Sequence, residues 1–280
     1  MIILKQENEA GGINATSNEN AARRWNTRAV GGQRSNVKPG SPDYFEQIKK
    51  YRYGYETPFI PRLLCHCEPE QKVLEIGVGN GIDAVEFASR GAEYFGIDIT
   101  ENHVLLAKAN LSINGYGKYQ IFHSDLLATD TGSDFDIVYS FGTLHHIAHE
   151  KEYLQNIYSI LKPHGELRVA LYSKYSFFNL YMFITWIIKN RCQVSFNKWQ
   201  GYVSDRADFD HPITIKIRSK KEIVRLYEET GFTLKKYYKR GFVQRYVPIF
   251  GELFLKPDGY VLNFLGTIFG WYHILILKKQ

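Results

Sequence analysis

The feature that most restricts the fold of this chain is a regular alternation of two sequence patterns between residues 72 and 172. Short apolar runs lie at 73–77, 94–98, 119–123, 135–140 and 166–172, and helical patterns lie near 82–90, 102–114 and 151–161. Strands that alternate with helices are typical of a parallel sheet whose crossover helices cover both faces. The alternation therefore predicts a doubly wound α/β fold.

The chain beyond residue 172 extends this sheet. Ser219 and Glu222 form a capping box that opens a helix to about residue 229, and Gly231 stands where a helix ends. Residues 232–239 and 271–279 then have the pattern of strands. We expect a Rossmann-like sheet of seven strands, mostly parallel, with an antiparallel last strand.

The N-terminal stretch differs in composition from the rest. Residues 5–43 are rich in Asn, Gly, Ser, Glu and Arg, and Trp25 is their only aromatic residue, so they cannot form a core of their own. We expect residues 1–43 to be a flexible tail or a lid. Residues 44–280 are expected to form one domain, with a lid helix in 44–70, the core in 72–172, an insertion in 173–218 and a final helix and strand hairpin in 219–280.

The insertion and the C-terminal connection carry the most apolar segments. Residues 177–188 are predicted to form a helix, residues 190–212 to be irregular, and residues 242–260 to form a long aromatic connection. A bilayer-spanning helix needs about 20 apolar residues, which 177–188 does not reach, and the run 260–277 is interrupted by polar residues and glycines. We therefore predict no transmembrane segment.

Composition excludes several classes of protein. Of the 280 residues, 44% are hydrophobic and 23% are charged, which argues against wholesale disorder. Three cysteines provide no disulfide framework, and the N-terminus lacks the apolar stretch of a secretory signal. These features favour a cytoplasmic location.

The net charge of +6 comes from one stretch. Residues 214–245 contain ten Lys or Arg against three Glu. Such a face can attract an anionic substrate, RNA, a peptide or a lipid surface, whereas DNA is not expected. The plainer alternative is a solvated exterior of a helix and a strand.

A glycine-rich turn follows the first strand. Glu75 precedes Gly77, Gly79 and Gly81, so the spacing is G-x-G-x-G, and Asp98 closes the next strand seventeen positions after Gly81. Glycine lets the backbone turn sharply and lets a ligand approach closely, and an acid at the end of the second strand can bind both hydroxyls of a ribose. The spacing differs from the G-x-G-x-x-G of nicotinamide enzymes.

These motifs resemble those of the class I S-adenosylmethionine-dependent methyltransferases. The resemblance is carried by residues 75–81, 96–100, 123–126 and 135–146, and it covers residues 72–172. The segment 141–146 together with 163–166 resembles the ubiquinone and menaquinone C-methyltransferase-like branch of small-molecule methyltransferases. The motifs are specific to the cofactor and not to the methyl acceptor.

The resemblance implies a set of cofactor-binding residues for S-adenosylmethionine. The glycine loop would hold the methionine half, Asp98 the ribose and Asp125 the adenine amino group. Arg52 would pair with the cofactor carboxylate; the alternative is that its helix only anchors its aromatic face on the sheet. The complete expected set is Tyr51, Arg52, Glu75, Gly77, Gly79, Gly81, Asp98, Ile99, Asp125, Leu126 and Ser140.

His145 and His146 are the candidate catalytic residues. They follow the fourth strand at the carboxyl edge of the sheet, where open α/β sheets bind ligands, and histidine titrates near neutral pH. One of them would then take a proton from the acceptor. The alternative is that both histidines order the turn.

No metal site is predicted. Cys65, His66 and Cys67 have no distant partner pair, so they do not form a zinc motif. Asp208, Asp210 and His211 meet no ligand-spacing rule with His145, and a lid or a capped turn explains them better.

The function expected from these observations is methyl transfer from S-adenosylmethionine to O, N or C of a small, partly hydrophobic metabolite, such as a natural product or a quinone-like compound. Residues 177–188 and 242–260 would roof the acceptor cavity, or else form extra core or a dimer face. Two alternatives stay open. One is a macromolecular acceptor, RNA or a peptide precursor, that docks on residues 214–245, and the other is a cofactor-binding protein that transfers no methyl group.

Overall fold

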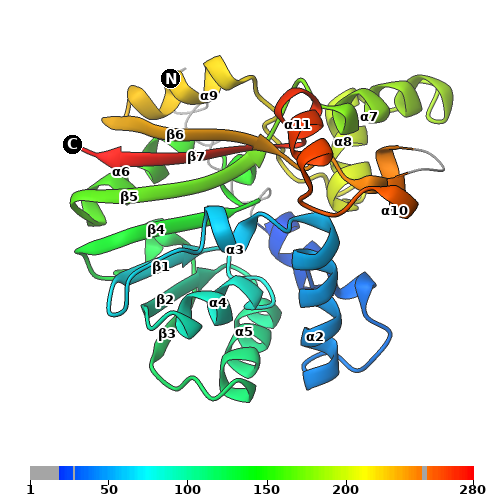
Figure 1. The fold of residues 1–280 in the computed structure, drawn as a ribbon. Helices are drawn as coiled ribbons and strands as arrows, with labels where there is room; N and C mark the ends of the chain where they lie inside the picture. Colours follow the sequence, from blue (N-terminus) through cyan, green and yellow to red (C-terminus); the bar gives the residue numbers. More distant parts are fainter. Residues whose placement is uncertain (1–18, 28, 248–250) are drawn as a thin grey trace, which may run out of the picture.

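The computed structural model describes residues 19–27, 29–247 and 251–280. Its centre is a seven-stranded sheet in the order β3-β2-β1-β4-β5-β7-β6 (Figure 1). The strands are β1 (Lys72–Ile76), β2 (Glu93–Asp98), β3 (Tyr119–His123), β4 (Phe135–Phe141), β5 (Leu161–Tyr172), β6 (Phe232–Arg240) and β7 (Tyr272–Lys279). Strands β1 to β5 pair in parallel, and β7 pairs antiparallel with both β5 and β6. The predicted fold class is confirmed.

Two layers of helices enclose the sheet. On one face, α4 (Ile82–Ser89) and α5 (Glu101–Ile113) bury Phe87 and Leu111 against the strands. On the other face, α6 (Glu150–Ile160) and α9 (Lys220–Glu228) bury Ile157 and Tyr227. Because β1 is covered on both faces, its residues after Lys72 are all buried, which explains the continuous apolar run in the sequence.

The N-terminal part lies beyond the carboxyl ends of the parallel strands, on the right in Figure 1. Helix α2 (Pro42–Tyr51) begins as predicted, with the Ser41 side chain accepting a hydrogen bond from the Tyr44 amide. A π-helical turn η2 (Arg52–Glu56) and the short α3 (Ile60–Leu63) follow. Of the expected tail, residues 19–27 are helical and η1 is Gly32–Arg34, while residues 1–18 and 28 lie outside the described residues.

The same end of the sheet carries the insertion. Helix α7 (Phe177–Ile188) has the predicted bounds. The prediction that residues 190–212 are irregular is wrong, because they contain α8 (Phe196–Asp205), which Ser195 caps by accepting a hydrogen bond from the Lys198 amide.

The connection before β7 is also more regular than expected. It contains η5 (Gln244–Tyr246), α10 (Gly251–Phe254) and α11 (Tyr260–Phe269), and residues 248–250 of it lie outside the described residues. Gly270 ends α11, and its amide bonds the carbonyl of Gly266. Two further 3₁₀ turns, η3 (Leu126–Ala128) and η4 (Leu144–His146), follow β3 and β4. In the described part of the chain, every helix is too short or too polar to cross a bilayer.

Candidate active site

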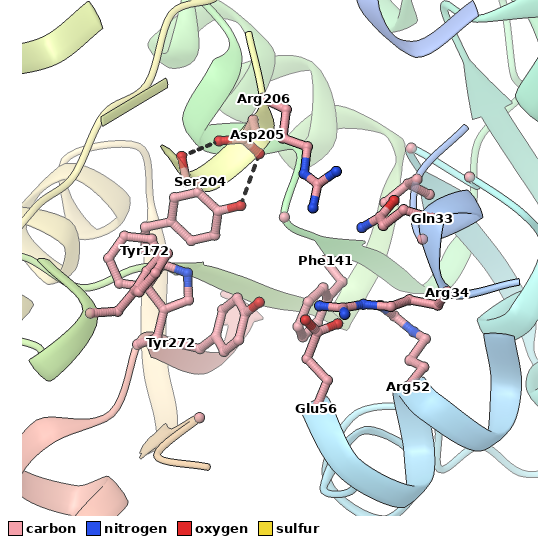
Figure 2. A pocket seen from close by; sticks show the side chains of 18 of the residues that line it. Gln33, Arg34, Arg52, Glu56, Phe141, Tyr172, Ser204, Asp205, Arg206 and Tyr272 are labelled. Carbon is pink, nitrogen blue, oxygen red and sulfur yellow. Dashed lines mark hydrogen bonds between the residues drawn. The ribbon is translucent and has the colours of Figure 1, made fainter. Parts of the chain in front are cut away.

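A cavity of about 680 Å³ opens at the carboxyl ends of the central strands. The loop after β1 and the start of α4 line one part of it, η1 and η2 line a second, and α7, α8 and β7 line a third. Figure 2 shows the second and third parts, with Tyr172 and Tyr272 on one side and Arg34 and Arg52 on the other. The topology thus brings segments from the whole chain to one place.

The glycine-rich turn forms the cavity floor beside β1. Gly77 and Gly79 line the cavity with φ of 84° and 52°, and Gly81 has φ 69°. A Cβ on Gly77 would overlap the Thr143 hydroxyl, and one on Gly81 would lie 2.7 Å from the Ala107 Cα. Both crowding and backbone conformation therefore require glycine here, and bare backbone faces the cavity.

Glu75 lies inside β1 and also reaches the cavity. Its carboxylate accepts a 2.6 Å hydrogen bond from the Tyr94 hydroxyl. Burial, and next the charge of Asp83, raises the pKa of Glu75 well above its ordinary value.

Arg52 and Asp83 form a buried pair at the cavity wall. Arg52 Nε donates to Asp83 Oδ1 over 3.0 Å and its Nη2 donates to Oδ2, while the hydroxyls of Tyr53 and Tyr139 donate to the same carboxylate over 2.6 and 2.7 Å. Burial alone would raise the pKa of Asp83, but the Arg52 charge and these hydrogen bonds hold it below its ordinary value. The guanidinium predicted to bind a cofactor carboxylate is thus already paired within the protein.

Tyr51 does not line the cavity in the described structure. The Arg34 guanidinium lies over its ring, 4.1 Å from the centroid. Burial raises the pKa of the Tyr51 hydroxyl. Tyr51 therefore supports Arg34, which does reach the cavity.

Asp98 closes β2 next to the glycine turn. Its Oδ2 accepts from the Gly79 amide and contacts His103 Nδ1, both at 3.1 Å, and its Oδ1 accepts from the Thr100 amide at 2.9 Å. Burial alone would raise the pKa of Asp98, but the His103 contact and the two amides hold it below its ordinary value. The carboxylate is therefore an anion anchored to the glycine loop.

A segment from the expected N-terminal tail covers this carboxylate. The Val30 amide donates to His103 Nε2 over 3.2 Å, the Asn80 side chain donates to the Val30 carbonyl, and the Trp25 ring lies 6.1 Å from the His103 ring. Trp25 and Val30 line the cavity, whereas Asp98 does not. The segment thus stands between Asp98 and the open cavity.

The other expected cofactor residues lie near the same edge but outside the cavity lining. Asp125 Oδ1 accepts from the Leu127 amide at 2.9 Å, and the carbonyl of Ile99 contacts His123 Nε2 at 3.2 Å. Leu126 is buried, and the Ser140 hydroxyl donates to the Ile76 carbonyl over 3.0 Å. Ser140 therefore braces β4 against β1.

Neither imidazole of the tandem pair lines the cavity in the described structure. The His145 ring is buried against the ring of Tyr172 with centroids 3.8 Å apart, and burial, then the charge of His146, lowers its pKa well below the ordinary value. His146 Nδ1 donates to the Thr214 carbonyl over 2.7 Å, and its Nε2 lies 3.7 Å from Asp205 Oδ1. His146 thus reaches the cavity only through Asp205.

Asp205 is the site residue that sequence reasoning missed. It is the last residue of α8, it lines the cavity, and its carboxylate accepts hydrogen bonds from the hydroxyls of Tyr172 (3.1 Å) and Ser204 (2.5 Å), as the dashed lines in Figure 2 show. The sequence patterns predict no helix over 196–205, so Asp205 was not a candidate, and Asp208 and Asp210 were weighed only as metal ligands and rejected. The Ser195 cap was the signal that would have found this helix.

Two arginines from opposite sides complete the cavity. Arg206 follows α8, Arg34 ends η1, and both side chains point into the open space in Figure 2. Among the described residues, neither forms an ion pair with a carboxylate. The described residues also contain no group of three His, Cys, Asp or Glu side chains that could hold a metal ion.

Comparisons with known proteins show what the core of this chain is similar to. A family model described as a methyltransferase domain matches residues 73–165. Phosphoethanolamine N-methyltransferase 2 of Caenorhabditis elegans is 26% identical over 196 residues, which are 69% of this chain and 38% of that protein. The mitochondrial ubiquinone biosynthesis O-methyltransferase of Schizosaccharomyces pombe is 25% identical over 111 residues, which are 39% of this chain and 40% of that protein.

The chain thus spans about two fifths of the length of these curated relatives. Among solved structures, a methyltransferase from Thermotoga maritima that depends on S-adenosylmethionine superposes with a TM-score of 0.54 at 19% identity. The match covers 85% of this chain and 94% of that one. This likeness agrees with the sheet order and the crossover helices described above.

Proposed function

Because this chain carries the core of a class I S-adenosylmethionine-dependent methyltransferase, we propose that it transfers a methyl group to O, N or C of a small, partly apolar metabolite. The observation that carries the proposal is the bond between the Asp98 carboxylate and the Gly79 amide of the glycine turn. It joins an anion at the end of β2 to bare backbone at the end of β1. A ribose with two adjacent hydroxyls fits such a carboxylate.

The residues at this edge fit the cofactor of the class. Asp98 would hold the ribose, Asp125 the adenine amino group, and the backbone of Gly77 and Gly79 the methionine half, since no Cβ stands in the way. When bound, S-adenosylmethionine supplies a methyl group that its sulfonium already makes electrophilic. The protein then has mainly to orient the acceptor and exclude water.

The acceptor side of the cavity is aromatic and carries positive charge. Phe141, Tyr172 and Tyr272 provide flat apolar walls, while Arg34 and Arg206 point inward without carboxylate partners among the described residues. These groups support an aromatic or otherwise apolar acceptor that carries a polar or anionic group.

Asp205 is the group we propose to receive a proton from an acceptor hydroxyl. Its carboxylate faces the cavity, and the Tyr172 and Ser204 hydroxyls that donate to it hold its orientation. His146 lies behind it at 3.7 Å and would act as a positioning residue, and His145 would pack the wall through Tyr172. The prediction that one of the two histidines takes the proton is therefore replaced here by the proposal that Asp205 takes it.

The basic segment 214–245 gives little support to a macromolecular acceptor. Four of its ten basic residues pair with carboxylates of this chain, namely Lys216, Arg218, Arg225 and Lys235. Lys239 donates to two backbone carbonyls. Much of the positive charge therefore braces the fold.

Titration calorimetry with S-adenosylmethionine tests the cofactor assignment. The substitution Asp98→Asn removes the charge that we propose for the ribose, and the loss of a hydrogen bond to a charged group, about 1.5–3 kcal/mol, should weaken binding about ten- to hundredfold. The matched control is Glu93→Gln, which changes an exposed carboxylate at the other end of the same strand and should leave binding unchanged.

Two results would overturn the proposal. If the unaltered chain gives no heat of binding, the assignment of the cofactor is wrong. If the two variants bind S-adenosylmethionine equally well, Asp98 does not contribute to its binding site. A screen for transfer of a labelled methyl group to small aromatic acids and phenols then tests the acceptor class. If the bound cofactor is never converted to S-adenosylhomocysteine with any acceptor, the result would favour the alternative that this chain binds the cofactor without transferring a methyl group.

A further inference from the structure

Helix α7 exposes its apolar side to solvent. Six large side chains form a stripe at helical spacing along its outer face, Phe177, Leu180, Tyr181, Ile184, Ile187 and Ile188, and their exposed fractions run from 37% to 69%. Met182 and Thr185 are its buried residues. A helix of a globular protein ordinarily turns its apolar stripe inward, so this helix is oriented to meet another apolar phase.

Helix α11 repeats the arrangement. Tyr260, Phe264 and Ile268 lie four residues apart and are 86%, 56% and 49% exposed, while Leu262 and Gly266 are buried. Large contiguous apolar surfaces on a protein mark sites of interaction. If α7 and α11 lie next to each other, their exposed apolar stripes together form such a surface.

The start of α7 and the end of α11 lie close together. The Lys239 ammonium donates to the carbonyl of Tyr175, just before α7, over 2.5 Å and to the carbonyl of Ile268 in α11 over 2.6 Å. The Phe242 ring contacts Phe177 and Phe269, with centroids 5.8 and 6.2 Å apart. Figure 1 shows α7 and α11 together at the end of the molecule beyond the carboxyl ends of the parallel strands. We call the exposed apolar residues of α7 and α11 the apolar rim.

The charges in the segment that contains α7 have one sign. Residues 174–204 contain four basic residues, Lys174, Lys189, Arg191 and Lys198, and no acidic residue. All four are exposed, and in the described part of the chain none of them pairs with a carboxylate. Long basic side chains beside an apolar surface can extend to lipid headgroups while their stems stay in the apolar layer.

We propose that the apolar rim and these four basic residues dock the protein on the surface of an anionic lipid bilayer. Apolar helix faces flanked by Lys and Arg bind in the plane of a bilayer interface. A protein partner fits less well, because an interface of standard size carries about ten direct hydrogen bonds and the outer stripe of α7 offers one side-chain polar group, the Tyr181 hydroxyl.

The docking surface borders the proposed acceptor site. Phe177 and Tyr181 belong to the apolar rim and also line the cavity. An apolar acceptor dissolved in the bilayer would therefore meet the cavity at the docked face. This part of the inference rests on the proposed function, whereas the docking itself does not.

Sedimentation with vesicles tests the docking. The unaltered chain should bind vesicles of phosphatidylcholine and phosphatidylglycerol more tightly than vesicles of phosphatidylcholine alone, and added salt should weaken the binding. The double variant Ile184→Glu, Phe264→Glu should lose at least about tenfold in affinity, because two apolar side chains no longer enter the lipid. Removing Lys189 or Arg191 by alanine should cost about fivefold each on anionic vesicles.

The matched control is Leu105→Glu, which introduces the same charge at a 60% exposed apolar residue of α5, far from the apolar rim in sequence. This variant should bind vesicles like the unaltered chain. Equal loss in the control and the double variant would overturn the proposal, as would a chain that takes up S-adenosylmethionine but binds neither kind of vesicle.

Light scattering tests the alternative that a second copy of this chain, and not a bilayer, covers the apolar rim. If the unaltered chain is a dimer in solution that the double variant dissociates, the apolar rim is an interface between copies and the proposal is wrong. If vesicle binding occurs but calorimetry finds no uptake of S-adenosylmethionine, the docking surface stands and the proposed function fails. Circular dichroism of each variant shows that its fold is retained.

Discussion

Replacing Asp83 with asparagine should destabilise the fold strongly although it changes the side-chain volume little. Asp83 is 3% exposed, and its carboxylate accepts hydrogen bonds from Arg52, Tyr53 and Tyr139. An asparagine keeps one acceptor oxygen, but it presents an amide donor to these donors and it carries no charge. The Arg52 guanidinium would then be buried without a counter-charge.

The expected loss can be bounded from the burial of both partners. Removing one partner of a buried ion pair costs about 3–5 kcal/mol. The Arg52 side chain keeps 20% exposure at the cavity wall and can be partly hydrated there, which places the loss near the lower bound, about 3 kcal/mol. Since a domain is stable by about 5–15 kcal/mol, this is a large fraction of the total.

The variant should also change how stability depends on pH. The folded pKa of Asp83 is held below its unfolded value of about 3.9, so its contribution is complete above that pH and is lost as the pH falls through the folded pKa. The variant lacks this carboxylate, and the difference in stability between the two chains should therefore shrink in acid below about pH 3.9.

Urea unfolding followed by tryptophan fluorescence measures the free energies. The control Glu86→Gln lies on the same helix and breaks the partly exposed pair with Arg90, which should cost about 0.5 kcal/mol. If the two variants lose the same free energy at neutral pH, or if the Asp83 difference persists unchanged in acid, the reasoning from burial is refuted.

Two other predictions concern the turn and the cavity. Gly77→Ala should lower the free energy of unfolding by about 2–5 kcal/mol, because positive φ and overlap with Thr143 both oppose a Cβ. The control Gly115→Ala, at φ 80° with open space around it, should lower it by only about 1–2 kcal/mol. Thermal unfolding compares the two variants, and equal losses would exclude crowding as a cause. Asp205→Asn should lower turnover of a hydroxyl acceptor about hundredfold or more and leave calorimetric uptake of S-adenosylmethionine unchanged, and undiminished turnover would exclude a proton-accepting role.

The central strands of the sheet could be predicted from the sequence because they are buried on both faces. Such strands have nearly continuous apolar runs, as in β1 and β2, where every residue after the first is buried. The capping box at Ser219 likewise identified the start of α9, since both of its hydrogen bonds form within four residues. The successful part of the prediction thus depended on patterns that can be read within a few residues of sequence.

The missed elements depend on contacts with distant parts of the chain. In α8, Trp199 donates from its indole to the Met182 carbonyl and Tyr172 bonds Asp205, so the neighbours of this helix come from α7 and β5. Its sequence mixes polar and aromatic residues with Gly201, which gives a weak helical pattern. Sequence alone therefore placed the cofactor motifs at the sheet edge but did not find the carboxylate on the acceptor side.

The segment that covers Asp98 touches both ends of the cavity. Val30 bonds His103 beside the glycine turn, and Arg24 Nε donates to the carbonyls of Asp205 and Arg206 over 3.1 and 2.9 Å. If a nucleoside binds at Asp98 as we propose and displaces Val30, the contacts that Arg24 of the same N-terminal stretch makes with the end of α8 would be perturbed as well. In that case cofactor and acceptor would be linked, and linkage requires each to alter the affinity for the other by the same factor.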